Sequence, residues 1–274
     1  MITQAEKAER LKALHEREGA FVIPNPWDVG AARLLAGLGF EALATTSAGF
    51  ANSLGRLDGQ VTRDEVLEHC RQLCAATALP VSADLENCFA RDPGGAAATI
   101  RLAAEAGLVG GSIEDYSGDP TEPIYDFGLA VERVGAAAEA ARSLDFPFTL
   151  TARAENLLHG RRDLDDTIRR LQAFEAAGAD VLYAPGLATL DEVRLVAGAV
   201  SKPVNVLATP LKGVTVAELA EAGAKRISVG GALARAAITV LMRAGTEMRT
   251  QGSFGWASDL ASSADVKRWL GAQT

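Results

Sequence analysis

The sequence contains few cysteine, histidine and aromatic residues, and these shortages limit its chemistry. Only three cysteines and three histidines occur in 274 residues. The cysteines have no CxxC spacing, which excludes a disulfide framework and a zinc site of the usual kind. The histidines are too scattered for a His-rich metal centre. Acid–base chemistry would therefore rest mainly on carboxylates, tyrosine, lysine or bound water.

Long apolar runs and basic clusters are also absent. No segment approaches the roughly 20 apolar residues that span a membrane, and residues 1–19 lack the apolar centre of a signal peptide. The formal charge is −8 and the basic residues are dispersed, which argues against nucleic-acid binding through phosphate contacts. These absences predict a soluble, cytoplasmic protein without a nucleic-acid or membrane partner.

Short apolar runs alternate with amphipathic segments along most of the chain. This alternation is typical of right-handed βαβ units with parallel strands, and eight units fit a (β/α)8 TIM-type barrel. No GxGxxG motif follows the first run, which disfavours a dinucleotide-binding fold. The predicted strands are 21–24, 42–46, 81–86, 110–114, 148–153, 181–184, 204–208 and 226–229. The predicted helices include 63–78, 94–106, 129–143, 164–177, 191–200 and 215–222.

We expect one barrel domain over residues 1–274, with an N-terminal helix before the first strand. Residues 251–274 are expected to form a helical extension that caps the barrel or packs on a neighbouring subunit. The polar segments 50–61 and 115–126 are predicted to be loops at the barrel mouth. The second has the proline and glycine content of a closing lid.

Acidic residues stand at the ends of two apolar runs. Asp84 and Glu86 end the third predicted strand, and Glu114 ends the fourth. Side chains alternate along a strand, so Asp84 and Glu86 should point the same way and need compensation for their like charges. Barrel active sites form at the C-terminal ends of the strands, where Mg²⁺ prefers carboxylates, waters and substrate oxygens. Solvated acids at strand ends are the alternative interpretation.

Other polar groups follow neighbouring strands. The hydroxyls and backbone N–H groups of residues 45–49 suit a carboxylate or phosphonate, although a plain turn is the alternative. Arg153 ends the fifth predicted strand as a buried cation near the acids. It is either a structural counter-ion or a fork for a substrate carboxylate.

Together these segments resemble the isocitrate lyase/phosphoenolpyruvate mutase superfamily over about residues 20–240. Each motif is weak alone, but their order and spacing are specific. The motifs are PWDVGAAR (26–33), TTSAG (45–49), LGRLD (54–58), DLE (84–86), SIED (112–115), TARAE (151–155) and KPVN (202–205).

The resemblance implies a Mg²⁺-dependent barrel, with Mn²⁺ as an alternative ion, that acts beside a 2-oxo or 2-hydroxy carboxylate. It also implies a homo-oligomer, a tetramer or dimer, that exchanges a C-terminal helix between subunits. It assigns the metal to Asp84, Glu86 and Glu114, although many members have aspartate at the second position. Asp58 would help to hold metal waters or substrate. Substrate contacts would come from Trp27, Thr46, Ser47, Ala48, Arg153 and Asn205.

The chain departs from the superfamily in its lid. The lyases carry a Lys-Lys-Cys-Gly-His motif, whereas residues 115–126 contain no lysine, cysteine or histidine. The lid of the mutases and hydrolases is missing too, and Pro185 stands in a segment where lyases usually show a glutamate. Tyr116, Tyr125 or metal-held water would then give a proton to an enolate, or the product would be released as the enol without a donor.

The sequence thus predicts Mg²⁺-assisted C–C cleavage, by retro-aldol reaction or decarboxylation, of a small 2-oxo or 2-hydroxy di- or tricarboxylate. Two alternatives remain open. One is a mutase or hydrolase acting on a P–C bond, and the other is an oxo-acid-binding protein without turnover.

Overall fold

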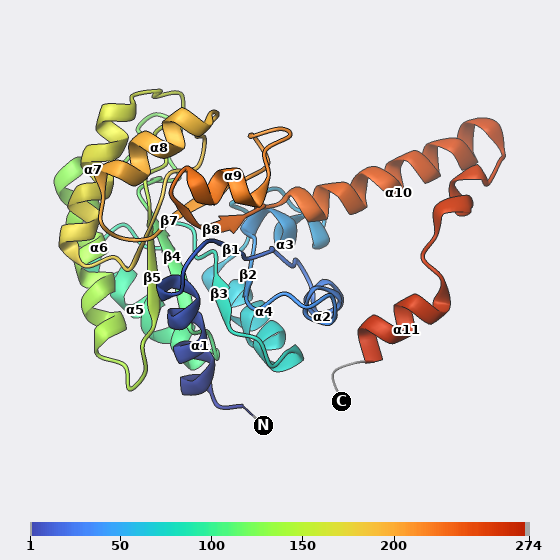
Figure 1. The fold of residues 1–274 in the computed structure, drawn as a ribbon, viewed down its shortest axis with the longest axis horizontal. Coiled ribbons are helices and arrows are strands. Elements are labelled where there is room, and N and C mark those ends of the chain that lie inside the picture. Colours follow the sequence, from blue (N-terminus) through green and yellow to red (C-terminus); the bar gives the residue numbers. More distant parts are fainter. Residues whose placement is uncertain (1, 272–274) are drawn as a thin grey trace.

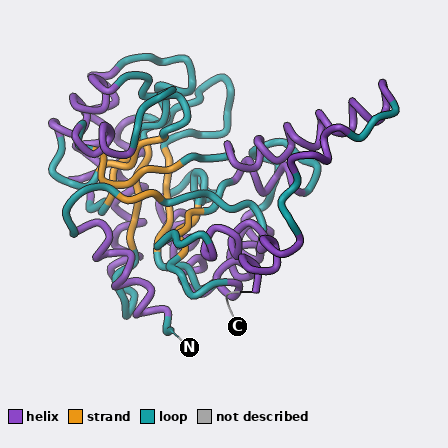
Figure 2. Tube along the Cα trace, turned by 45° about the vertical axis from the view of Figure 1, so that its right-hand side comes forward, coloured by secondary structure: helices purple, strands orange, loops and turns teal. Residues whose placement is uncertain are grey.

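The computed structural model describes residues 2–271, and a curled sheet of eight parallel strands forms its centre (Figures 1 and 2). The strand order is β1-β8-β7-β6-β5-β4-β3-β2. The strands are β1 (Phe21–Val22), β2 (Leu43–Ala44), β3 (Val81–Ala83), β4 (Gly110–Glu114), β5 (Thr149–Arg153), β6 (Val181–Tyr183), β7 (Val204–Leu207) and β8 (Ala224–Ser228).

The two end strands of this order meet just beyond β1. The N–H of Ala44 donates to the carbonyl of Pro24 over 3.1 Å, and the amide of Asn25 donates to the carbonyl of Thr45 over 3.0 Å. These bonds link the neighbourhoods of β1 and β2. The (β/α)8 TIM-type architecture expected from the alternation of apolar runs is confirmed.

Helices surround the sheet, and α1 lies beneath the N-terminal ends of the strands, where Leu11 and Leu14 pack with Phe21 (Figure 1). The helices that follow are α2 (Val29–Gly37), α3 (Ser47–Ser53), α4 (Arg63–Ala76), α5 (Pro93–Glu105), α6 (Phe127–Arg142), α7 (Leu164–Ala177), α8 (Leu190–Ala199) and α9 (Val216–Glu221). The first helix, α1, spans Gln4–Glu16.

Glycines end several helices, as the sequence predicts. Gly39, Gly107, Gly178 and Gly223 follow α2, α5, α7 and α9, and their φ angles lie between 93° and 108°. Only glycine adopts this left-handed backbone without strain. The four positions therefore fix where each helix stops and the next strand begins.

Two expectations about the mouth are wrong. Residues 50–61 are not wholly a loop, because α3 occupies 47–53; the hydroxyl of Thr46 caps it by accepting from the N–H of Gly49 over 3.3 Å. The third strand ends at Ala83, so Glu86 lies beyond it with φ 50°. The period-two argument that pairs Glu86 with Asp84 fails, because the backbone has already left the extended conformation.

The C-terminal part leaves the barrel. The long helix α10 (Ala232–Gln251) projects from the body in Figure 1, and the chain then returns through η1 (Gly255–Asp259) and α11 (Ser263–Gly271). Within the described chain α11 packs against α2, where a Cβ on Gly37 would come 2.7 Å from the carbonyl of Trp269. None of the helices within residues 2–271 is long and apolar enough to cross a membrane.

Candidate active site

Two adjoining cavities open at the C-terminal ends of the strands. The inner one, of about 180 Å³, reaches into the barrel, and the outer one, of about 580 Å³, lies beneath the 115–126 segment. They share Ser47, Asp58, Arg153 and Leu158. The inner volume suits a small molecule, because pockets for drug-sized ligands measure about 300–1,000 Å³.

Asp84 lines the inner cavity just beyond the end of β3. Its Oδ2 accepts from the N–H of Ser47 over 3.1 Å, and its Oδ1 lies 2.7 Å from Nη1 of Arg153. Its own N–H donates to the hydroxyl of Thr45 over 2.9 Å. The hydroxyl of Ser112 and the N–H of Glu86 also donate to Oδ1 over 3.4 Å, so the carboxylate is fixed from α3, β4 and β5, and it is Oδ2 that keeps a spare lone pair for a further ligand.

Arg153 lies among the acids rather than free in the cavity. Besides Asp84, its Nη2 lies 3.1 Å from Oε2 of Glu114 and 2.8 Å from Oε1 of Glu155, which also accepts from its Nε over 2.8 Å. Burial lowers the pKa of Arg153, but Glu155, Glu114 and Asp84 together raise it above its ordinary value. This geometry makes Arg153 a counter-ion of three carboxylates.

One guanidinium does not balance the acids at the mouth. Burial, with Asp84 and Asp58 nearby, raises the pKa of Glu86 to about 7. Burial also raises the pKa of Asp58 and of Glu114, against the lowering effect of Arg153. The folded protein therefore resists placing full negative charge here, and a bound cation would relieve that cost.

The donor set fits Mg²⁺ in its usual protein environment. Among residues 2–271, no three His, Cys, Asp or Glu side chains form a ready-made metal cage. Mg²⁺ does not need one, because it keeps several waters and binds through one or two carboxylates plus substrate oxygens. Asp84, Glu86 and Glu114 offer hard oxygen donors around the two cavities.

Most of the backbone N–H groups at 47–49 already donate hydrogen bonds to other groups of the protein. The N–H of Ser47 donates to Asp84 and that of Gly49 to Thr46, so these two groups are not free as the sequence suggested. Thr46, Ser47 and Ala48 nevertheless line the inner cavity. Of the N–H groups at 47–49, that of Ala48 is the one for which no acceptor is found within residues 2–271.

The outer cavity carries a histidine that sequence reasoning missed. Tyr116 stacks on His159 with ring centroids 3.9 Å apart, and Nε2 of His159 lies 3.8 Å from Oε2 of Glu155. Tyr125, by contrast, is buried beneath the guanidinium of Arg133, 4.2 Å from its ring centroid. The structure thus puts Tyr116 at the mouth and leaves Tyr125 as a packing residue.

Two more missed residues line the inner cavity. Tyr183 ends β6 beneath Arg153, and Arg226 lies within β8. The buried amide of Asn205, expected to contact substrate, accepts from Nε of Arg226 over 2.8 Å and donates to Ser228 over 3.0 Å. Trp27 is not among the residues that line either cavity; it packs against Gly49 of α3.

A sequence signal existed for some of these residues. Glu155 stands two places after Arg153, and on an extended backbone this spacing puts both on one side. Arg226 is a charge inside an apolar strand, but the predicted strand began at 226 instead of 224, so its inward position was not apparent. His159 lies in a loop, and no periodic pattern predicts which way a loop side chain points.

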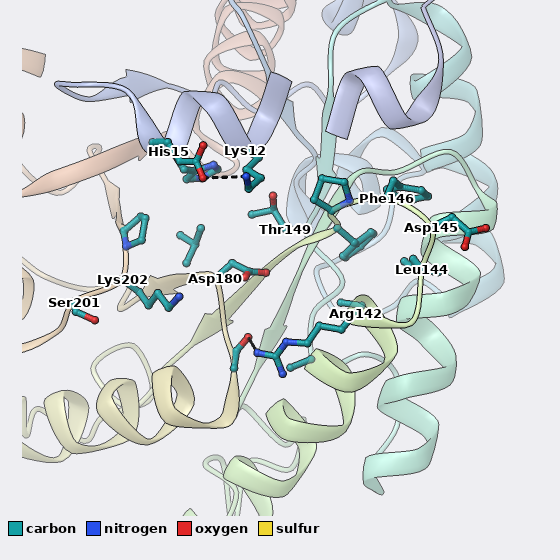
Figure 3. A pocket seen from close by; sticks show the side chains of 18 residues that line it. Lys12, His15, Arg142, Leu144, Asp145, Phe146, Thr149, Asp180, Ser201 and Lys202 are labelled. Carbon is teal, nitrogen blue, oxygen red and sulfur yellow. Dashed lines mark hydrogen bonds and ion pairs between the residues drawn. The ribbon is translucent and has the colours of Figure 1, made fainter. Parts of the chain in front are cut away.

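A larger cavity lies at the opposite end of the barrel. It measures about 740 Å³. Side chains near the start of β5 and β6 line it, as Figure 3 shows. Lys12 pairs with Glu16 over 3.1 Å, and Asp180 accepts from the N–H of Leu150 over 2.8 Å. Its three lysines and arginines face three carboxylates, so its charges balance and its size does not indicate a site.

Fold and site together define a (β/α)8 barrel protein with an acidic mouth suited to a small anion and a cation. The phosphoenolpyruvate phosphomutase family profile matches residues 11–249, and the chain belongs to this family. A solved structure of a candidate lyase/mutase from Burkholderia cenocepacia J2315 is 59% identical, covers 98% of this chain and 97% of its own, and has a TM-score of 0.95.

Two curated proteins are similar to this chain over most of its length. An uncharacterized protein of Mycobacterium tuberculosis is 32% identical over 79% of this chain and 80% of its own length. The 2-methylisocitrate lyase of Halalkalibacterium halodurans is 28% identical over 90% of this chain and 79% of its own. The superfamily resemblance read from the motifs is confirmed.

Proposed function

We propose that this protein is a Mg²⁺-dependent lyase that cleaves a C–C bond in a small 2-oxo or 2-hydroxy di- or tricarboxylate through an enolate. The observation that carries the proposal is the excess of buried carboxylates beside a cavity of about 180 Å³. Kinship with a 2-methylisocitrate lyase supports C–C chemistry.

Asp84, Glu86 and Glu114 would hold the cation. When bound, Mg²⁺ would stabilise the negative charge that develops on the 2-oxygen as the bond breaks. Arg153 keeps Asp84 and Glu114 oriented through its ion pairs of 2.7 and 3.1 Å. The rigid hydrogen-bonded setting of Asp84 means that little reorganisation is needed during the reaction.

The substrate carboxylate would lie against the 46–48 segment. The N–H of Ala48 and the hydroxyls of Thr46 and Ser47 border the inner cavity. Leu158 and Tyr183 form apolar parts of its wall, which limits water around the reacting atoms.

His159 is the proton donor that we add to the sequence-based candidates. Its ring is stacked on Tyr116 and faces the buried carboxylate of Glu155. The stacking and the nearby carboxylate hold the imidazole in place at the outer cavity. The Tyr116–His159 pair would supply a proton to the enolate in place of the absent lid motif.

Parallel turnover assays test the proposal. Purified protein, stripped of metal and then supplied with Mg²⁺, is incubated separately with oxaloacetate, 2-methylisocitrate and phosphonopyruvate. Mg²⁺-dependent pyruvate release from a C–C substrate, lost in the D84N variant, is the expected result. Turnover of phosphonopyruvate alone would favour the P–C alternative, and binding without any turnover would favour an oxo-acid-binding protein.

We also propose that the chain assembles as a homo-oligomer, a tetramer or dimer. Val240, Leu241 and Met242 on the projecting helix α10 are 57%, 72% and 66% exposed. Apolar side chains gathered on one element are typical of an interface. Sedimentation equilibrium would distinguish the monomer from these assemblies.

A further inference from the structure

Arg226 is a buried cation without a partner of opposite charge. The residue is 5% exposed, and no ion pair within residues 2–271 includes it. Its Nε donates to Asn205, but its Nη1 is buried with no hydrogen-bond acceptor. A buried unpaired charge is costly, so a native protein retains one only where something offsets the cost.

The residues around Arg226 hold its guanidinium in place at the wall of the inner cavity. Arg226 lines the inner cavity from β8, which lies beside β1 and is therefore separated by one strand from β2 and the 46–48 segment that follows it. The amide of Asn205 is held by Ser228 and so fixes the guanidinium plane. Burial lowers the pKa of Arg226 to about 10, with Arg153 contributing in the same direction.

Other charged groups near Arg226 do not neutralise it. The His15 ring lies below it at the N-terminal end, and burial followed by the Arg226 charge lowers the pKa of His15 to about 3. That histidine is therefore neutral. Asp84, Glu114 and Glu155 are engaged by Arg153, whose four contacts with them leave one of its five N–H groups, too few for a two-bond fork to a substrate carboxylate.

We propose that Arg226 binds the second, distal carboxylate of the substrate and makes this site selective for dicarboxylates. This inference deepens the proposed function and rests on it. It also moves to Arg226 the role that the sequence suggested for Arg153. A guanidinium presents two parallel N–H groups to a carboxylate, and the free Nη1 supplies one of them.

Two matched ligands isolate the distal carboxylate. Malate differs from lactate only by that group, and both are stable in the presence of Mg²⁺. Calorimetry with Mg²⁺ measures both ligands on wild type, R226M, R226K and K225M. Lys225 is the matched control, because it lies on the same strand but donates outward, to the carbonyl of Gly19 over 2.8 Å.

We expect R226M to weaken the binding of malate by roughly 10- to 100-fold, the range for a lost charged hydrogen bond. The affinity for lactate should be unchanged. R226K should fall between, and K225M should match wild type. Equal weakening of both ligands, or of neither, overturns the inference. If wild type binds neither ligand, the proposed function itself fails.

Denaturant unfolding separates this role from a structural one. Methionine has a similar length and no charge, so R226M should be at least as stable as wild type, because the cost of burying the cation is removed. A marked loss of stability in R226M, with unaltered preference for malate, would instead make Arg226 a structural element of the barrel.

Discussion

The two ends of the barrel differ in how their charges are matched. At the N-terminal end, a cavity of about 740 Å³ has three cationic and three acidic side chains. At the C-terminal end, a smaller inner cavity adjoins carboxylates that burial drives toward protonation. Size alone would point to the wrong end, whereas unmatched charge points to the end where barrel enzymes do their chemistry.

The contrast follows from what each end must do. Side chains such as Lys12 and Glu16 pair on one helix at the closed end and stabilise the fold modestly. At the mouth, Glu114 is paired with Arg153, whereas Glu86 has no ion-pair partner within residues 2–271, and the proposed cation would offset the cost of its charge. Stability and function thus make opposite demands on charge, and the barrel separates them spatially.

The largest effect should come from removing Asp84. D84A should abolish measurable Mg²⁺ binding and lower turnover by roughly 100-fold or more, because it removes several kcal/mol of charge stabilisation. E86A and E114A should weaken both. Calorimetry with Mg²⁺ checks the series, with D145A at the other end as control. An unchanged Mg²⁺ affinity in D84A would contradict the proposed metal site.

The lid pair is expected to matter next. H159Q should reduce kcat by roughly 100-fold, the lower range for general acid–base catalysis, with a smaller effect of Y116F. Y125F should keep full turnover, because Tyr125 is buried beneath Arg133. Steady-state kinetics over pH distinguishes these cases. Full activity in both H159Q and Y116F would assign the proton to bound water.

Stability should depend on pH through Glu86. Its pKa rises from 4.5 to about 7, so the folded state holds this proton more tightly than the unfolded chain. The contribution of Glu86 to the stability of the fold is fully present below about pH 4.5 and is lost as the pH rises through 7. At pH 8, the free energy of unfolding of E86Q should exceed that of wild type by up to about 3 kcal/mol. At pH 4.5, the two free energies of unfolding should be equal.

Denaturant unfolding at both pH values measures this, and E16Q is the control because Glu16 is an exposed partner of Lys12. Added Mg²⁺ should narrow the gap at pH 8, since the cation stabilises the ionised carboxylate. An E86Q variant that follows the wild-type pH profile would contradict the picture of an unmatched mouth.

The smallest expected effect concerns Arg153. R153K keeps the charge but loses the fork that contacts Asp84, Glu114 and Glu155. It should weaken pyruvate and oxaloacetate alike, by about 1.5–3 kcal/mol. Dissociation constants for both ligands test it. If R153K weakens the binding of oxaloacetate but not of pyruvate, the distal carboxylate binds to Arg153 and not to Arg226.

The sequence predicted the architecture well because strand and helix periodicity is local. Strand β4 and helix α7 were predicted with the bounds that the structure shows. The helix α3 was missed because it is seven residues long and starts within a glycine- and serine-containing segment. Short helices depend on capping and tertiary contacts, such as that between Thr46 and Gly49, more than on composition.

The site was predicted less completely for a related reason. The strand ends located Asp84, Glu114 and Arg153 near one another, but partners depend on rotamers and on packing across the barrel. The capture of Arg153 by three carboxylates, and the missing partner of Arg226, are properties of the folded interior. No spacing rule along the chain contains them.

A crystal structure with Mn²⁺ and oxalate tests the central claim most directly, because Mn²⁺ scatters anomalously and replaces Mg²⁺ at oxygen sites. The account predicts one anomalous peak at the mouth, in contact with Asp84 and within reach of Glu86 and Glu114, with oxalate against the 46–48 segment. A peak in the N-terminal cavity, or none at the mouth at saturating Mn²⁺, would contradict it.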